Sequence, residues 1–262
     1  MIRGLYTAAA GMSTQQQNID VISNNIANVN TTGFKQDRAE FQDLMYQSLN
    51  YTAGATSATT NNPTGIDVGL GVRVSGVQKN FIQGSLRETG NTYDFAIQGD
   101  GFFKVITANG DTAYSRNGEF KLDKDGAIVN GQGFKLEPEI VIPPDLVKIS
   151  IAEDGTVSGS NATTGDITQL GQITISTFIN PSGLAPQGNS LYLASEVAGD
   201  AVEGTPGLNG IGSIRQGMLE SSNVQMVTEM VNLITAQRGY EANSKAITTT
   251  DTMLQTVNQL KR

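Results

Sequence analysis

The two ends of this sequence have the periodicity of amphipathic helices, whereas the residues between them have the short period of β-strands. Within residues 1 to about 30, apolar side chains recur at steps of three and four, with an interruption at Gln15: Leu5, Ala8, Met12, Ile19, Ile22, Ile26 and Val29. Residues 224–262 carry a second set: Val227, Met230, Val231, Ile234, Ile247, Leu254 and Val257. Two distant helices, each with one apolar face, predict chain ends that pack on another surface.

The N-terminal helix has almost no charge, because residues 1–34 contain only Arg3 and Asp20 as charged side chains. Its polar face consists mainly of Asn and Gln. A helix of this kind is suited to a place among other helices, and an ordinary helix packed on its own domain is the alternative. We expect it to end near residues 28–30, with Gly33 in a left-handed turn conformation.

Composition excludes most catalytic chemistry. The 262 residues include no Cys and no His, so a disulfide, a thiolate nucleophile, a histidine base and a Ser-His-Asp triad are all impossible. The formal net charge of −8 argues against nucleic acid or an anionic membrane as the main partner. No apolar run approaches the roughly 18 residues of a membrane span. The N-terminus lacks a cleavage pattern, so any export is expected to leave it in place.

The middle of the chain predicts antiparallel β-structure. Alternating apolar residues and Gly/Asp turns indicate strands at 72–77, 93–98, 102–106, 120–122, 127–129, 140–142, 147–151, 172–179 and 190–193. Many short strands without alternating long helices favour a sandwich or barrel.

The remaining segments leave alternatives open. Residues 35–49 can form a short helix or an extended arm, and the low-complexity residues 46–65 can form a flexible loop or an extended hairpin. The Gly-rich residues 205–212 indicate a linker out of the β-region. Ser221–Asn223 then predicts an N-cap for the last helix.

Three kinds of motif are chemical candidates, and none favours a reaction. Asp123–Gly126 is similar to half of a Ca²⁺ loop, but Phe134 stands where an EF-hand needs a bidentate Glu, so a β-turn is favoured. The Gly-rich residues 131–133 and 207–212 lack the arrangement of a phosphate loop. The two carboxylates of Glu137–Glu139 are more simply a solvated rim than an acid–base pair. We expect no catalytic, cofactor or metal site.

Four segments resemble the family of bacterial flagellar rod and hook proteins. Asp20–Lys35 is similar to the N-terminal signature of this family, and Ser222–Lys245 to the C-terminal one. Asp94–Phe103 and Tyr114–Phe120 resemble the central β-domain. Three further segments, at 41–46, 68–73 and 84–90, are most similar to the distal-rod members, and the chain is short for a hook protein. Gly239 departs from the family pattern, in which Ala is common.

The resemblance implies an α+β fold, with the terminal helices paired as an antiparallel coiled coil inside a helical polymer and a mainly antiparallel β-domain outside. The implied domains are a discontinuous helical domain at 1–30 and 222–262, a connecting segment at 31–67 with an extended loop at about 46–65, and a β-rich domain at 68–221. The implied polymer contacts are Leu5, Met12, Ile19, Ile22, Asn25, Ile26, Asn28, Val29, Val227, Met230, Val231, Ile234, Arg238, Tyr240, Ile247, Leu254 and Val257. The implied subunit-bridging loop contains Tyr46, Tyr51, Thr56, Thr60, Asn62 and Pro63.

By resemblance, the function is that of a structural distal-rod subunit, which forms a rigid tube and transmits motor torque to the hook. The implied partners are copies of the chain itself, proximal-rod and hook or hook-junction proteins, the surrounding ring proteins and the export apparatus. The implied location is the basal body, from the periplasm toward the outer membrane, where absence of Cys suits an oxidising compartment. A hook or proximal-rod subunit is the alternative within the family. A periplasmic carbohydrate-binding or cell-wall-acting β-domain is the alternative from another class.

Overall fold

The computed structural model describes residues 2–50, 55–57, 60–61, 66–161 and 166–260. The chain forms two compact units, each assembled from separate stretches of sequence. The helical unit contains the described residues of 1–26, 37–78 and 226–262, and the β unit contains those of 27–36 and 79–225. Residues 37–78 therefore group with the terminal helices, whereas the sequence placed them in a connecting segment and at the start of the β-domain.

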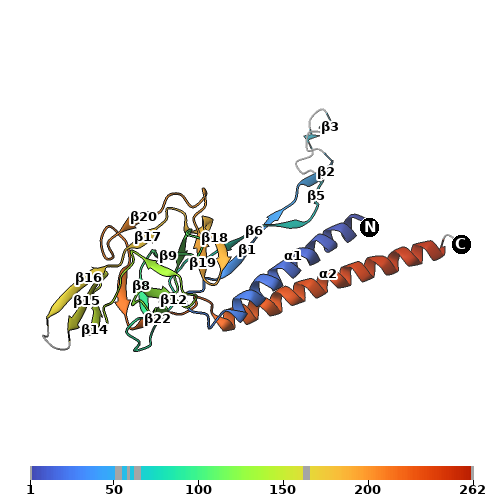
Figure 1. Ribbon diagram of the computed structural model, residues 1–262. Coiled ribbons are helices and arrows are strands. Elements are labelled where there is room, and N and C mark those ends of the chain that lie inside the picture. The colour runs from blue at the N-terminus through green and yellow to red at the C-terminus, as the bar shows by residue number, and fades with distance from the viewer. Residues whose placement is uncertain (1, 51–54, 58–59, 62–65, 162–165, 261–262) are drawn as a thin grey trace. The chain divides into compact units, whose positions relative to one another are not determined.

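Two long helices form most of the helical unit: α1, Ile2–Ala27, and α2, Met226–Leu260. They lie side by side and run in opposite directions, so that the start of α1 and the end of α2 are at the same end of the pair (Figure 1). Neither helix contains proline, which allows both to run without a kink from its missing N–H. The two predicted terminal helices and their antiparallel pairing are confirmed.

The turn after α1 agrees with the prediction, but the start of α2 does not. Gly33 has a φ of 68°, which is the left-handed conformation expected there. The N-cap predicted at residues 221–223 is wrong, because α2 begins only at Met226. The Asn223 amide instead accepts the Gln36 N–H at 2.8 Å and donates to the Asn80 and Ile82 carbonyls at 2.8 and 3.0 Å. It satisfies three backbone groups of the β unit.

A strand ribbon completes the helical unit. β1, Asp37–Asp43, pairs with β6, Val72–Lys79; β2, Tyr46–Asn50, pairs with β5, Ile66–Gly69; and β3, Ala55–Ser57, pairs with β4, Thr60–Asn61. The described residues of this segment are thus extended, which decides between the arm and the helix. The ribbon contacts α1 where the Thr14 hydroxyl donates to the Val72 carbonyl at 3.4 Å.

Among the described residues, the β unit contains the other sixteen strands and one 3₁₀ turn, η1, Pro181–Gly183. The strands are β7 Leu86–Glu88, β8 Phe95–Gln98, β9 Phe102–Ile106, β10 Thr112–Ser115, β11 Phe120–Leu122, β12 Ile128–Asn130, β13 Lys135–Glu137, β14 Leu146–Ile151, β15 Thr156–Asn161, β16 Ile167–Gln172, β17 Ile175–Thr177, β18 Ala185–Gly188, β19 Leu191–Leu193, β20 Val202–Gly204, β21 Ser213–Gln216 and β22 Met218–Glu220. Nine form one antiparallel sheet in the order β11-β12-β13-β9-β10-β19-β18, with β17 beside β9 and β20 beside β17. The others form β14-β15-β16, β8-β21 and β7-β22.

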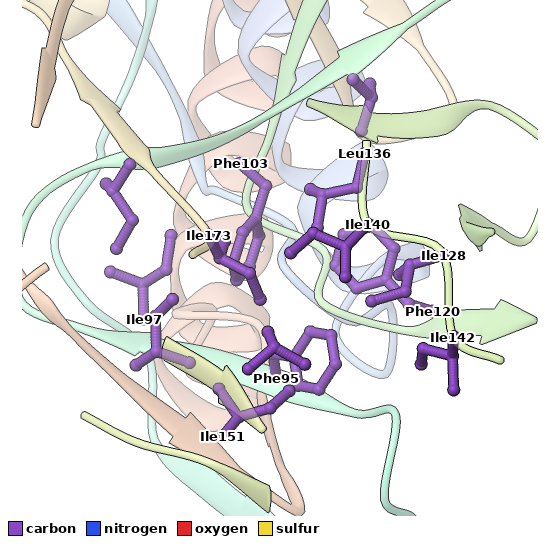
Figure 2. Close-up of a cluster of buried hydrophobic side chains, with 14 of the residues drawn as sticks. Phe95, Ile97, Phe103, Phe120, Ile128, Leu136, Ile140, Ile142, Ile151 and Ile173 are labelled. Atoms are coloured by element: carbon purple, nitrogen blue, oxygen red, sulfur yellow. The ribbon is translucent and has the colours of Figure 1, made fainter. Parts of the chain in front are cut away.

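The central strand β9 of the nine-stranded sheet contributes buried side chains on both faces. Phe103 and its alternate neighbour Val105 belong to one cluster, together with Phe95, Phe120 and Ile173 (Figure 2). Phe102, the residue before Phe103, belongs to a second cluster. Successive side chains of a strand point to opposite faces, so β9 supplies both cores. The large apolar residues that the sequence concentrates in short strands are therefore used inside the β unit.

Three local predictions in the β unit are corrected. Residues 205–212 are an ordered turn rather than a linker, since the Gly212 N–H donates to the Asp100 carbonyl at 2.9 Å. Residues 140–142 form only an isolated bridge at Val141, and the predicted strand 172–179 is divided between β16 and β17. The turn predicted at 123–126 is confirmed, because the Gly126 N–H donates to the Asp123 carbonyl at 2.9 Å.

Candidate assembly surface

The two helices pair in one register along their length. Asn243 lies against Gly11, Gly239 lies against Gln15, and Asn25 donates to the Glu229 carboxylate at 3.3 Å. From Gly11 to Gln15 the residue number in α1 rises by four, while the number of the contacted residue in α2 falls by four. From Gln15 to Asn25 the residue number rises by ten in α1 and falls by ten in α2. A constant step of this kind is the signature of antiparallel helices without a slip. It places Gly239 opposite Gln15, the residue that interrupts the α1 periodicity.

Polar and small residues, rather than large apolar ones, line much of this contact. Asn25 and Glu229 are both buried, and Ala236 is the buried apolar residue of α2. The Asn25 amide also donates to the Asp37 carbonyl and accepts the Asp37 N–H, both at 2.8 Å. Asn25 therefore fixes the start of β1 against the helices.

The large apolar residues at the start of α2 are exposed. Their exposed fractions are 76% for Val227, 51% for Met230, 55% for Val231 and 50% for Ile234. At about 100° per residue these four and Arg238 occupy an arc of roughly 100° on one side of the helix. We call Val227, Met230, Val231 and Ile234 the α2 stripe. The same geometry places Glu229, Ala236 and Asn243 about 180° away, on the side that contacts α1.

This division places the residues of the predicted C-terminal seam on two sides of α2. Ile247 and Leu254 are half-buried and lie on the α1 side of α2, as does the exposed Tyr240. Val257, 51% exposed, lies between the two sides. The predicted set is thus two faces of one helix: an inner one, used within the chain, and an outer one, the α2 stripe.

The predicted residues of α1 are placed mostly inside the helical unit. Ile22 and Asn25 are buried, and the others are half-buried: Leu5, Met12, Ile19 and Ile26 in the helix, with Asn28 and Val29 in the turn after it. Of the predicted bridging loop, Tyr46 is 62% exposed on β2, and Thr56 and Thr60 belong to β3 and β4. Tyr51, Asn62 and Pro63 lie outside the described residues.

A buried charge cluster in the β unit was not foreseen from the sequence. Lys35 Nζ lies 2.6 Å from Glu220 Oε1, and Arg116 lies 3.4 Å from Glu220 Oε2, with all three side chains at most 2% exposed. Lys35 also donates to the Ile82 carbonyl at 2.9 Å, and Arg116 to the Gly99 carbonyl at 2.8 Å. The cluster joins the segment after α1, the residue that follows β10 and the end of β22.

The two cations share one carboxylate, and burial opposes their charge. Burial lowers the pKa of the Lys35 ammonium, an effect that Glu220 opposes and Arg116 reinforces. Burial likewise lowers the pKa of Arg116, against the attraction of Glu220. A guanidinium nevertheless stays protonated in proteins, so the cluster keeps a positive charge that Glu220 must hold. Such an arrangement fixes geometry rather than performing a reaction.

The weak chemical candidates have structural partners. Glu137 lies 3.0 Å from Lys104, which also lies 2.9 Å from Glu203, and Glu139 lies 2.7 Å from Lys135. Among the residues that the structure describes, no group of Asp and Glu is arranged to hold a metal ion. In the same residues, no helix is long and apolar enough to cross a membrane.

Comparison with known proteins identifies the family. Three family models match the chain: "Flagella basal body rod protein" at residues 5–35, "Flagellar hook protein FlgE/F/G D1 domain" at 96–159 and "Flagellar basal body rod FlgEFG protein C-terminal" at 215–260. The flagellar basal-body rod protein FlgG of Borreliella burgdorferi is 47% identical over the whole of both chains.

Two members of this family from one organism differ in their sequence identity to this chain. FlgG of Caulobacter vibrioides is 43% identical, over 99% of this chain and 100% of that protein. The rod protein FlgF of the same organism is 35% identical, over 95% of this chain and 94% of that protein. Full-length identity at this level, with the paired terminal helices and the antiparallel β unit, shows that the chain belongs to the FlgG family of structural, non-enzymatic basal-body rod proteins, the subunits of the distal rod.

Proposed function

We propose that the subunit builds the distal rod by burying the α2 stripe against neighbouring copies, so that the terminal helices line an inner tube. The observation that carries this is the exposure of four large apolar side chains, Val227, Met230, Val231 and Ile234, on one side of α2. The other side of α2 is already used by α1, so the stripe is the apolar face left for a partner. Contiguous exposed apolar surface of this kind marks an interaction site.

The energetics favour assembly through many modest contacts. Full burial of a Val, Ile or Met side chain contributes about 1.5–3 kcal/mol. Three of the four side chains are about half-buried already, and Val227 is 76% exposed. Completing their burial therefore adds a few kcal/mol per copy, by the same relation. A subunit that contacts its neighbour through different surfaces forms an open helical filament when the rotation between copies does not close a ring. In such a polymer, torque passes through repeated packing contacts.

The remaining roles follow from the place of a rod in the basal body. We assign the strands at 46–69 to contacts that bridge adjacent copies and stiffen the rod. The partners are other copies, the proximal rod, hook or hook-junction proteins, the surrounding rings and the flagellar export apparatus. The location is the rod between the periplasm and the outer membrane. Membership of a distal-rod family supports these assignments.

Two valine substitutions test the assembly surface. Val231→Asp places a charge in the stripe, and Val202→Asp places one on β20, at nearly the same exposure of 54%. The first variant is expected to stay monomeric in sedimentation and electron microscopy, because a buried unpaired charge is strongly disfavoured. The Val202→Asp variant is expected to polymerise. As a control for folding, melting of the β unit should be the same in Val231→Asp as in the wild type. Normal rods from Val231→Asp would refute the proposal.

A further inference from the structure

A groove in the helical unit lies beside α1. It has a volume of about 400 Å³ and is lined by Gln17, Asp20, Val21, Ala39, Val74, Ser75, Gly76 and Val77. α1 contributes the first three of these residues, β1 contributes Ala39, and β6 contributes the rest. Val77 is 53% exposed, and no atom lies within 4 Å of the Cβ position of Gly76. The groove is therefore open and largely apolar, and Asp20 supplies its carboxylate.

Asp20 has no ion pair among the described residues, and it is the only acidic side chain of α1. Arg238 of α2 is exposed and has no ion pair within the same part of the chain. It follows Ile234 by one helical turn and lies within the arc that holds the α2 stripe. The α2 stripe is thus followed by one cation, Arg238, and the largely apolar groove contains one anion, Asp20.

We propose that the α2 stripe of one copy lies in the α1–β6 groove of the next, with Arg238 of the first copy paired with Asp20 of the second. The proposal rests on the proposed function and specifies its interface. A helix that lays its apolar face into an apolar groove is a recurring mode of recognition. The charge pair sets the register, because like charges placed together at an interface are disfavoured.

The two surfaces also give the correct kind of assembly. Stripe and groove are different parts of one chain, so each copy presents a free stripe at one contact and a free groove at the other. A heterologous contact of this kind continues without closing when its rotation does not complete a ring. The polymer therefore grows along a helix, and each added copy exposes the same groove for the next one.

Charge reversal at the two positions tests the pairing. Asp20→Arg and Arg238→Asp are each expected to raise the critical concentration for polymerisation more than about tenfold, because each places two like charges together. An equimolar mixture of the two variants is expected to polymerise. Where the stripe of an Arg238→Asp copy lies in the groove of an Asp20→Arg copy, the two introduced charges attract each other. At the next contact, the native pair of Arg238 and Asp20 forms. Asp251→Arg, an exposed charge reversal on another side of α2, is the control and should polymerise normally.

The outcomes separate this inference from the function on which it rests. Normal polymerisation of both single variants, or a mixture that stays monomeric while the wild type and Asp251→Arg polymerise, overturns the groove pairing alone. Normal rods from Val231→Asp overturn both the pairing and the assembly role of the stripe. An unchanged helical circular dichroism signal of each monomer, together with unchanged melting of the β unit, confirms that the substitutions act on assembly and not on folding, because positions 20, 231 and 238 lie in the helical unit.

Discussion

Gln15 of α1 lies directly against Gly239 of α2: a methyl group at position 239 would stand 3.4 Å from the Gln15 side-chain carbonyl carbon. The Gln15 amide oxygen is buried and has no hydrogen-bond partner among the described residues. Gln15, which interrupts the apolar periodicity of α1, therefore meets Gly239, which lies in the stretch of α2 between Ile234 and Ile247 that has no large aliphatic residue. The glycine makes room for a polar side chain between the helices, and α2 continues through it as one helix.

Gly239→Ala should be accepted and should stabilise the helix pair. The added methyl group makes an ordinary van der Waals contact with Gln15, and alanine in a helix interior is favoured over glycine by about 0.8–1 kcal/mol. The helical signal in circular dichroism should persist to a higher temperature. Gly118→Ala is the opposite case, because its Cβ would overlap the Phe95 carbonyl, and it should disrupt the β unit. A lower melting temperature for Gly239→Ala would show that the register is wrong.

Glu220→Gln should strongly destabilise the β unit. Removing the one carboxylate leaves Lys35 and Arg116 as two buried cations without a counter-charge and costs about 3–5 kcal/mol. The effect is measured as the change in the urea unfolding free energy. Glu119→Gln is the matched control: its partner Lys121 is 4.0 Å away and its side chain is 47% exposed, so the loss should be at most about 1 kcal/mol. Equal losses in the two variants would contradict a structural role for the cluster.

Asp154→Asn should change how stability depends on pH. The Thr156 backbone N–H donates to the Asp154 carboxylate at 3.0 Å and lowers its pKa below the ordinary 3.8. A carboxyl with a lowered folded-state pKa contributes stability that is complete above 3.8 and is lost as the pH falls through the folded value. Unfolding curves at about pH 6 and about pH 2.5 should show a difference between wild type and variant that shrinks in acid. A difference that stays constant would exclude this linkage.

Deleting residues 52–64 should soften the rod without preventing its assembly. The pairing of Tyr46 with Gly69 and Gln47 with Val68 lies outside the deletion, and so do the helices and the β unit. Loss of the bridging contacts assigned to this segment should shorten the persistence length of the polymer in electron micrographs. Rods as straight and stiff as those of the wild type would remove the bridging assignment.

Local sequence patterns determined the elements that depend on neighbouring residues. Periodicity located both helices, Gly33 marked the turn after α1, and Asp123–Gly126 marked a tight turn. The periodicity of α2 did not separate its two faces, because the gap between Ile234 and Ile247 contains no large aliphatic residue that would show the change of side.

Contacts between distant residues could not be predicted in this way. Lys35 and Glu220 are 185 positions apart, and nothing in either local segment indicates that both are buried. Asn223 has the residue type of a helix cap, yet its amide binds three backbone groups of the β unit. In both cases the outcome depends on which backbone groups the fold brings within hydrogen-bond distance.

Thiol protection tests the central assembly surface most directly. The chain has no Cys, so Val231→Cys and Val202→Cys each introduce a single thiol at nearly equal exposure. The reaction rate of each thiol with a maleimide is measured in the monomer and in the assembled rod. We predict that the thiol at 231 reacts in the monomer and is protected in the rod, while the thiol at 202 reacts in both. A thiol at 231 that reacts as fast in the rod as in the monomer would contradict burial of the α2 stripe.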